Sequence, residues 1–386
     1  MIETVETHGG GPADEVSVSL VDCDVHPTFP AHWSQSLYPY FSAEWRHRFG
    51  ARPYVGGDAG QRAGLSYVLP FNGFYPIPQS PIQMHLIREG EGPPASDPAI
   101  TGRDLFDTMG VSRAILQSPL GGAISSMPTP DPVIALAAAT NEYMKETWLK
   151  ADRRYRGTIS FAWHDPGEAV REIDRWAADK QWVGVSTGIG TVLMGDRHWF
   201  PIYEACEHHG LAIHLHTIGA GPANYRSGPT YAGGMPSYHM DFRVMFLHVD
   251  QANLANMVAC GVFARFPRLR VIVTEAGFAW LPQMMWQMDS FWKGNREDTP
   301  WLTRPPSEYI LENVRLTTQP FIEPKHGRHT EQILDMIEAD RILMFATDYP
   351  HWDAEDPALV LPKIPERFRE RVAHQTAVET FGDRIL

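Results

Sequence analysis

Cysteine is scarce in this chain of 386 residues. The three cysteines, Cys23, Cys206 and Cys260, follow no recognisable spacing. Few and unpatterned cysteines are typical of a reducing compartment, so we expect a cytoplasmic protein. The chain also lacks an apolar run long enough to cross a bilayer. Residues 1–17 are acidic and glycine-rich without an apolar signal-peptide segment, and we expect them to form a disordered N-terminus.

Positive charge is also in short supply. The 33 lysines and arginines are outnumbered by 46 aspartates and glutamates, which gives a net charge of -13. No run of basic residues offsets this balance. An acidic chain of this kind argues against nucleic acid or an anionic membrane as the partner. We expect a small-molecule substrate instead.

Nucleotide-binding motifs and internal repeats are missing as well. The chain contains no Walker loop, no repeat of fixed period and no low-complexity segment. Two glycine pairs, Gly188-Ile-Gly190 and Gly219-Ala-Gly221, lack the rest of a dinucleotide fingerprint. We interpret both pairs as turns.

Strand-like and helix-like runs alternate from Val111 onwards. The strand-like runs are Val111–Gln117, Gly157–Trp163, Trp182–Thr187, Leu211–His216, Leu269–Glu275, Val314–Thr318 and Ile342–Asp348. The helix-like runs include Asp131–Lys150, Gly167–Lys180, Trp199–Gly210, Leu254–Phe266 and Trp280–Trp292. Together with a first strand at Val18–Asp24, the alternation predicts eight parallel strands joined by crossovers. Eight such units close an α/β TIM barrel, and a doubly wound open sheet is the alternative.

A single domain is predicted over residues 18–386. Residues 28–107 interrupt the pattern after the first strand, and they are rich in proline, glycine and aromatic residues. So long an irregular connection within a compact domain is usually a functional insertion. We therefore expect a lid-like insertion that covers the site.

The first strand has a polar face. In an extended chain Asp22, Asp24 and His26 share one face, whereas Val21, Cys23 and Val25 share the other. A parallel sheet is buried on both sides, so the polar face cannot simply be solvated. Cys23 would then face away from this polar side, which makes it a poor candidate nucleophile.

Metal-ligating side chains stand where several predicted strands end. They are Asp24 and His26 on the first strand, His214 and His216 on the fifth, Glu275 on the sixth and Asp348 on the eighth, followed by His351. In a TIM barrel the carboxyl ends of the strands carry the active site. This set of carboxylates and imidazoles favours a metal site over buried polar residues that only satisfy one another. We expect His214, deeper on its strand, to be a core or supporting histidine, and His248 to be structural.

Several motifs together resemble the amidohydrolase-related, decarboxylase-like branch of the amidohydrolase superfamily. They are Asp24-x-His26, His216, Thr274-Glu-Ala-Gly-Phe-Ala-Trp-Leu-Pro282, Ala346-Thr-Asp-Tyr-Pro-His351 and the connecting segment Gly261–Val271. The resemblance implies a distorted TIM barrel with one divalent metal ion. The ligands that it implies are Asp24, His26, His216 and Asp348.

The chain departs from that branch at two positions. The first ligand of the pair is Asp24, where many members have His or Glu, and Glu275 stands where many decarboxylases have His. The fourth strand offers no lysine that could bridge two metals after carboxylation. A two-metal site would therefore need Glu275 or another carboxylate as a ligand.

The ligand types indicate the chemistry that we expect. Asp348 is suited to general-base work beside a metal-bound water, Glu275 could act as a ligand or a general acid, and His351 would orient the substrate. Zinc is the metal that we expect first, while manganese, iron or cobalt also suit such ligands.

Three functions are compatible with this site. The first is a metal-dependent non-oxidative decarboxylase or hydrolase acting on a small carboxylic acid or amide. The second is an iron–manganese or di-iron oxygenase, similar to family members that hydroxylate 2-aminoisobutyrate as paired subunits. The third is a non-catalytic barrel with structural zinc that stabilises a partner. We favour the first and expect a homodimer, or a hetero-oligomer with a related barrel subunit.

Overall fold

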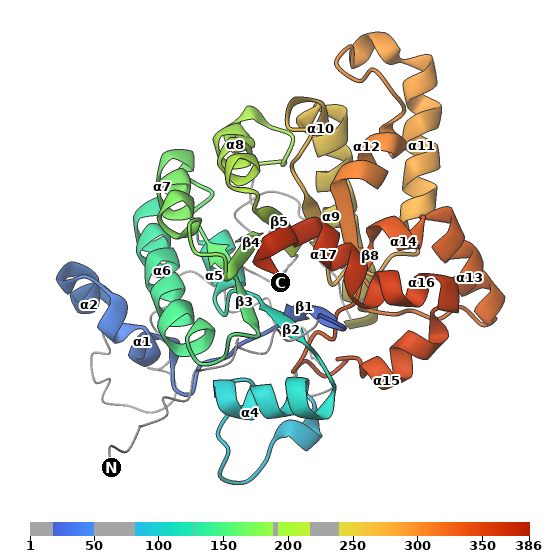
Figure 1. Ribbon diagram of the computed structural model, residues 1–386. Coiled ribbons are helices and arrows are strands. Elements are labelled where there is room, and N and C mark those ends of the chain that lie inside the picture. Colours follow the sequence, from blue (N-terminus) through green and yellow to red (C-terminus); the bar gives the residue numbers. More distant parts are fainter. Residues whose placement is uncertain (1–17, 50–81, 128, 188–191, 217–238) are drawn as a thin grey trace, which may run out of the picture.

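Eight parallel strands form one sheet in which each strand pairs with the next one along the chain (Figure 1). The structure is a computed structural model that describes residues 18–49, 82–127, 129–187, 192–216 and 239–386. The strands are β1 (Val21–Val25), β2 (Arg113–Leu116), β3 (Tyr155–Ser160), β4 (Trp182–Thr187), β5 (Ala212–His216), β6 (Val271–Thr274), β7 (Val314–Thr317) and β8 (Leu343–Met344).

The last strand returns to the first and closes the barrel. The Cys23 amide donates to the Phe345 carbonyl at 3.0 Å, and the Asp348 amide donates to the Asp24 carbonyl at 3.0 Å. Val25 and Tyr349 form a further parallel bridge. An open doubly wound sheet would keep its edge strands apart, so the predicted TIM barrel is confirmed and the alternative is wrong.

Helices surround the barrel on the outside (Figure 1). The longer ones are α6 (Pro130–Tyr143), α7 (Pro166–Trp176), α8 (Phe200–His209), α9 (His239–Ala259), α11 (Leu281–Gly294), α12 (Pro306–Asn313) and α13 (Gly327–Met336). Shorter ones are α10 (Val262–Arg265), α14 (Ala339–Ile342), α15 (Pro357–Val360) and α16 (Glu366–Glu370), while α17 (Thr376–Phe381) lies across one end of the barrel. Local sequence sets several ends: Asp165 caps α7 by accepting from the Glu168 amide, and Gly210 ends α8 in the left-handed conformation.

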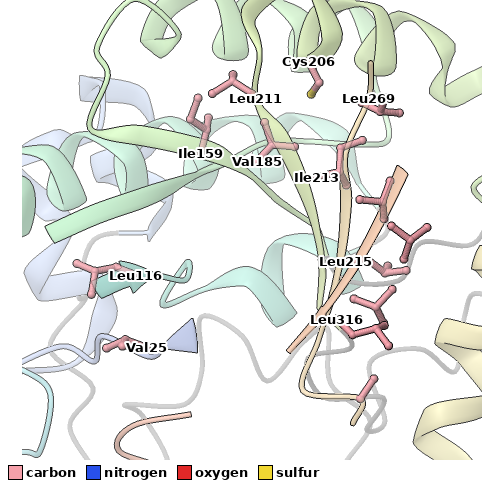
Figure 2. Close-up of a cluster of buried hydrophobic side chains, with 14 of the residues drawn as sticks. Val25, Leu116, Ile159, Val185, Cys206, Leu211, Ile213, Leu215, Leu269 and Leu316 are labelled. Atoms are coloured by element: carbon pink, nitrogen blue, oxygen red, sulfur yellow. The ribbon is translucent and has the colours of Figure 1, made fainter. Parts of the chain in front are cut away.

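The apolar side chains form two buried layers. One layer lies between the strands and the helices, and Figure 2 shows part of it, including Val25, Leu116 and Leu316. The other lies inside the barrel, where residues from six strands meet the C-terminal segment: Val21, Cys23, Ile115, Val183, Ala212, Ile272, Met344, Ala377, Phe381 and Ile385. The C-terminal segment therefore fills the amino-terminal end of the barrel, and polar chemistry is left to the carboxyl end.

Two details differ from the sequence-based expectation. The register of β1 against β2 shifts between Asp22 and Val25, so Val21 and Cys23 pack inside the barrel while Val25 packs outside. The predicted helix Leu254–Phe266 is also wrong, because α9 begins at His239 and ends at Ala259. Gly261 breaks the run with φ +75°, and a Cβ there would lie 2.3 Å from Trp301.

The insertion is described only at its two ends. These contain α1 (Trp33–Ser36), α2 (Ala43–Phe49) and α4 (Pro98–Gly102), with short 3-10 turns between them and a π-helical turn after α4. The main-chain amide of Gln83 donates to the Pro350 carbonyl at 3.1 Å, and its side-chain Nε2 donates to the Ala354 carbonyl at 2.9 Å. The insertion thus contacts the loop that carries His351, and its role as a lid stays a prediction.

Several expectations fall on residues outside the described ranges. These are the disordered N-terminus, the middle of the insertion and both glycine pairs. In the part of the chain that the structure describes, no helix is long and apolar enough to cross a membrane.

Candidate metal centre

Four predicted ligands meet at the carboxyl end of the barrel. The Nε2 atom of His26 lies 3.2 Å from Asp24 Oδ1 and 3.0 Å from Asp348 Oδ1. The same atom is 3.3 Å from His216 Nε2. Asp24, His216 and Asp348 are buried, and the His26 side chain is 12% exposed. Strands β1, β5 and β8 are far apart in sequence, and the closed barrel brings their ends to one point.

Glu275 and His351 lie beside these four. Glu275 Oε2 is 3.7 Å from His216 Nε2. His351 Nδ1 is 2.7 Å from Asp348 Oδ1, and its ring lies against that of His26 with centroids 4.3 Å apart. The structure therefore brings all six predicted site residues together.

The two carboxylates at the ends of β6 and β8 sit on unusual backbone. Glu275 has φ +55° and Asp348 has φ +64°, in the left-handed region that residues other than glycine rarely adopt. Supporting contacts hold them there: the Glu275 amide donates to Thr317 Oγ1, and Gln319 Nε2 donates to Asp348 Oδ2 at 3.1 Å. Strained residues of this kind cluster at functional sites.

Proximity and burial set the charges of the cluster. Burial alone would raise the pKa of Asp24, but His26 and His216 outweigh it and hold that pKa well below its usual range. The pKa of Asp348 is also lowered, because His351 and His26 outweigh burial. Burial, followed by the charge of Asp348, raises the pKa of Glu275. The ligand carboxylates Asp24 and Asp348 are therefore the anionic members.

The arrangement fits a divalent metal ion. Asp24 is fully buried, yet neither of its carboxylate oxygens has a hydrogen bond within the described ranges. Leaving such groups unsatisfied is costly. Two sets of ligand atoms, each within 4.8 Å, share His26: Asp24, His26 and His216 form one, and His26, Glu275, Asp348 and His351 form the other. A cation bound by nitrogen and oxygen ligands would satisfy these groups.

Asp22 and His214 lie below the cluster. Asp22 accepts from the Thr347 amide at 2.9 Å and from Thr347 Oγ1 at 2.6 Å, and burial raises its pKa to about 7. His214 stacks on Phe381 and is 3.4 Å from Gln117 Nε2, and burial lowers its pKa to about 3. His214 therefore belongs to the barrel interior beneath the site, whereas Asp22 ties β1 to the segment that carries Asp348.

Two nearby residues were missed in the sequence. Gln319 follows β7 at the same end of the barrel, so the rule that selected the other strand ends could have found it. Arg243 contacts Glu275 and Asp353 from α9. Arg243 lies in a helix, far from any strand end in the sequence, so no sequence pattern pointed to it.

Comparison with known proteins assigns the chain to a family. The sequence profile of the amidohydrolase family matches residues 84–382, which is most of the chain, so the chain belongs to that family. Among curated proteins, the gamma-resorcylate decarboxylase of Polaromonas sp. is 25% identical over 267 residues, covering 64% of this chain and 75% of that protein.

Solved structures show the same fold. The 5-carboxyvanillate decarboxylase of Sphingomonas paucimobilis has a TM-score of 0.61 at 22% identity, with 95% of this chain and 99% of that chain covered. A dihydroxybenzoic acid decarboxylase of Polaromonas sp., solved with manganese and the inhibitor 2-nitroresorcinol, has a TM-score of 0.62 at 18% identity, with 95% and 97% covered. At these identities the similarity establishes the barrel.

Proposed function

We propose that this protein is a metal-dependent decarboxylase that removes CO2 from an aromatic carboxylic acid without an oxidant. The observation that carries the proposal is the meeting of Asp24, His26, His216 and Asp348 at the carboxyl end of the barrel. Membership of the amidohydrolase family and the decarboxylase names of the relatives above support the same reaction class.

Asp24, His26, His216 and Asp348 would hold the ion. A divalent ion there would act as a Lewis acid toward oxygen atoms of the substrate and stabilise negative charge as the carbon–carbon bond breaks. Zinc, expected from the ligand types, stays a prediction. Manganese is the metal named for the Polaromonas structure and is the one to test first.

Decarboxylation replaces the carboxylate with a proton on the same carbon. The electron pair of the broken bond stays on the substrate, CO2 leaves, and a general acid supplies the proton. Asp348 Oδ1 is 2.7 Å from His351 Nδ1, and the His351 side chain is 32% exposed. His351 can therefore bring a proton from solvent to Asp348, which passes it to the substrate. Asp348 is anionic at rest and acts here as the relay for the proton of His351, whereas the sequence predicted a general base.

The alternatives differ in their products. Hydrolysis of an amide would release an amine and no CO2, and oxygenation would consume O2. Neither the oxygenase nor the structural-zinc interpretation finds support among the relatives named above.

The experiment measures CO2 release by manganese-loaded protein under argon, with gamma-resorcylate and 5-carboxyvanillate as substrates. We expect equal rates with and without O2. D348N is the matched variant: Asn has nearly the same shape, and we expect a rate about 10²–10⁴ times lower because the proton donor is lost. CO2 release that requires O2, or hydrolysis of amides without CO2 release, would contradict the proposal.

We also propose a homodimer as the assembly. The helix α11 exposes Trp286 and Phe291, at 58% and 64%, and large exposed apolar side chains of this kind suit a subunit interface. Light scattering on the purified protein would give the mass, and a monomer at micromolar concentration would contradict the proposal.

A further inference from the structure

Arg243 makes a double ion pair at the edge of the metal centre. Its Nη1 atom is 2.8 Å from Glu275 Oε1, and its Nη2 atom is 3.0 Å from Asp353 Oδ2. The side chain of Arg243 is 25% exposed, and those of Glu275 and Asp353 are 10% and 17% exposed. The guanidinium is thus held by charge-assisted hydrogen bonds at both ends, in partly buried surroundings where such contacts are strong.

The ligand atoms near Arg243 are numerous enough for two ions. The set of Asp24, His26 and His216 and the set of His26, Glu275, Asp348 and His351 meet at His26. Glu275 belongs only to the second set. It is also one of the two positions at which the chain departs from the resemblance described above, because a carboxylate stands in place of an imidazole. A carboxylate at this position adds the negative charge that a second cation would need.

We propose that Arg243, held in place by Asp353, keeps the centre mononuclear by engaging Glu275. This inference rests on the metal centre of the proposed function. Glu275 Oε1 is already bound to a fixed cation, so binding a second metal ion through this carboxylate would require breaking the ion pair or accepting the repulsion between two close cations.

The charges of the site support this assignment. Asp24 and Asp348 supply two negative charges at the ligand cluster, which balance one divalent ion. Glu275 and Asp353 are both paired with the positive charge of Arg243. A second divalent ion would therefore meet no carboxylate of the cluster that is without a counter-charge, unless Arg243 were removed. The arginine therefore sets the number of ions.

The test is the number of metal atoms per chain. Metal-free full-length protein is titrated with Mn²⁺ by isothermal titration calorimetry, and the loaded protein is measured by elemental analysis after desalting. We expect one ion for the natural chain even in millimolar Mn²⁺, and two for R243M. R243K keeps the positive charge and should bind one. R243M/E275Q lacks the extra carboxylate and should return to one.

A matched control removes a comparable arginine elsewhere. Arg88 pairs with Glu91 at 3.0 Å and with Asp104 at 3.1 Å, outside the metal centre. R88M should therefore bind one ion. Two ions in the natural chain, or one ion in folded R243M, would overturn the inference and leave the decarboxylase proposal standing. No ion in the natural chain would overturn both.

Discussion

Each oxygen of the Asp348 carboxylate has its own partners. Oδ1 faces His26 and His351 at 3.0 Å and 2.7 Å, and Oδ2 accepts from Gln319 Nε2 at 3.1 Å. The Gln319 contact leaves Oδ1 directed toward the histidines. Supporting hydrogen bonds of this kind orient ligands and catalytic groups, and their loss is felt in activity.

Replacing Gln319 with leucine should lower kcat about 10–100-fold, because Asp348 loses the donor that orients it. Leucine also leaves the buried Asp348 Oδ2 without this donor, so the free energy of unfolding should fall by about 1–3 kcal/mol. Steady-state kinetics of Q319L and Q319E measure the effect. Q319E should have a still lower kcat, since it places a second carboxylate beside Asp348. A Q319L enzyme with the natural kcat would contradict this role of Gln319.

Glu355 gives a pH prediction outside the ligand set. Its Oε1 accepts from the Phe321 amide, and burial raises its pKa to about 7. A raised pKa means that the folded chain binds the proton more tightly than the unfolded chain. This stabilisation is present at low pH and is lost as the pH rises toward 7.

Urea unfolding at pH 5.5 and pH 8 would test this effect. Between pH 5.5 and pH 8, the free energy of unfolding of the natural chain should fall by about 2 kcal/mol more than that of E355Q, because glutamine does not titrate. Comparing the two proteins cancels the other groups that titrate in this range. Equal losses would contradict the shifted pKa of Glu355.

Among the contacts between whole strands, the closure of β1 against β8 depends on one side chain. Regular β8 is only two residues long, and Asp22 of β1 extends the closure by accepting from both the amide and the hydroxyl of Thr347. Thr347 directly precedes Asp348. The contact therefore ties the position of a site residue to the barrel beneath it.

T347V should lower the free energy of unfolding by about 1–3 kcal/mol, because it leaves a buried Asp22 oxygen without its hydroxyl donor. T140V is the matched control. Thr140 of α6 is fully buried, and its hydroxyl has no hydrogen bond within the described ranges, so the isosteric change should be nearly neutral. Chemical denaturation measures both, and equal effects would contradict the role of Asp22.

Strand ends were predictable, but their fine geometry was not. The strand–helix alternation predicted the barrel. The polar residues that follow β1, β5 and β8 predicted which end carries the candidate site, since parallel strands bring their carboxyl ends together. The shift in β1 that separates Val25 from Cys23 depends on pairing with β2, which periodicity does not encode. The contact of Arg243 with Glu275 depends on where α9 lies after the barrel has closed.

In the molecule as a whole, the two ends of the barrel have different roles. Phe381 and Ile385 pack into the amino-terminal end of the barrel, and Arg113 and Arg156 donate to backbone carbonyls of the same C-terminal segment. This packing does not involve the ligand cluster at the opposite end. The barrel should therefore stay folded when the metal is removed.

Chelation should abolish activity and lower the melting temperature without unfolding the chain at 25 °C. An ion present at a hundred times its Kd stabilises the folded state by about 2–3 kcal/mol, and this amount is lost on removal. Circular dichroism melts of chelated and Mn²⁺-restored protein measure the shift. Unfolding at 25 °C on chelation would show instead that the ion is required for the fold.

The cytoplasmic location expected from the cysteine content stays a prediction. The roles of the six site residues are likewise part of the proposal, and all of them require an ion bound among these side chains.

The most direct test is anomalous diffraction at the manganese edge from crystals of the Mn²⁺-loaded protein. One strong peak in contact with Asp24, His26, His216 and Asp348, with Glu275 still paired to Arg243, is the predicted result. No peak among these side chains in a fully loaded crystal, or a peak bound elsewhere on the chain, would contradict the account.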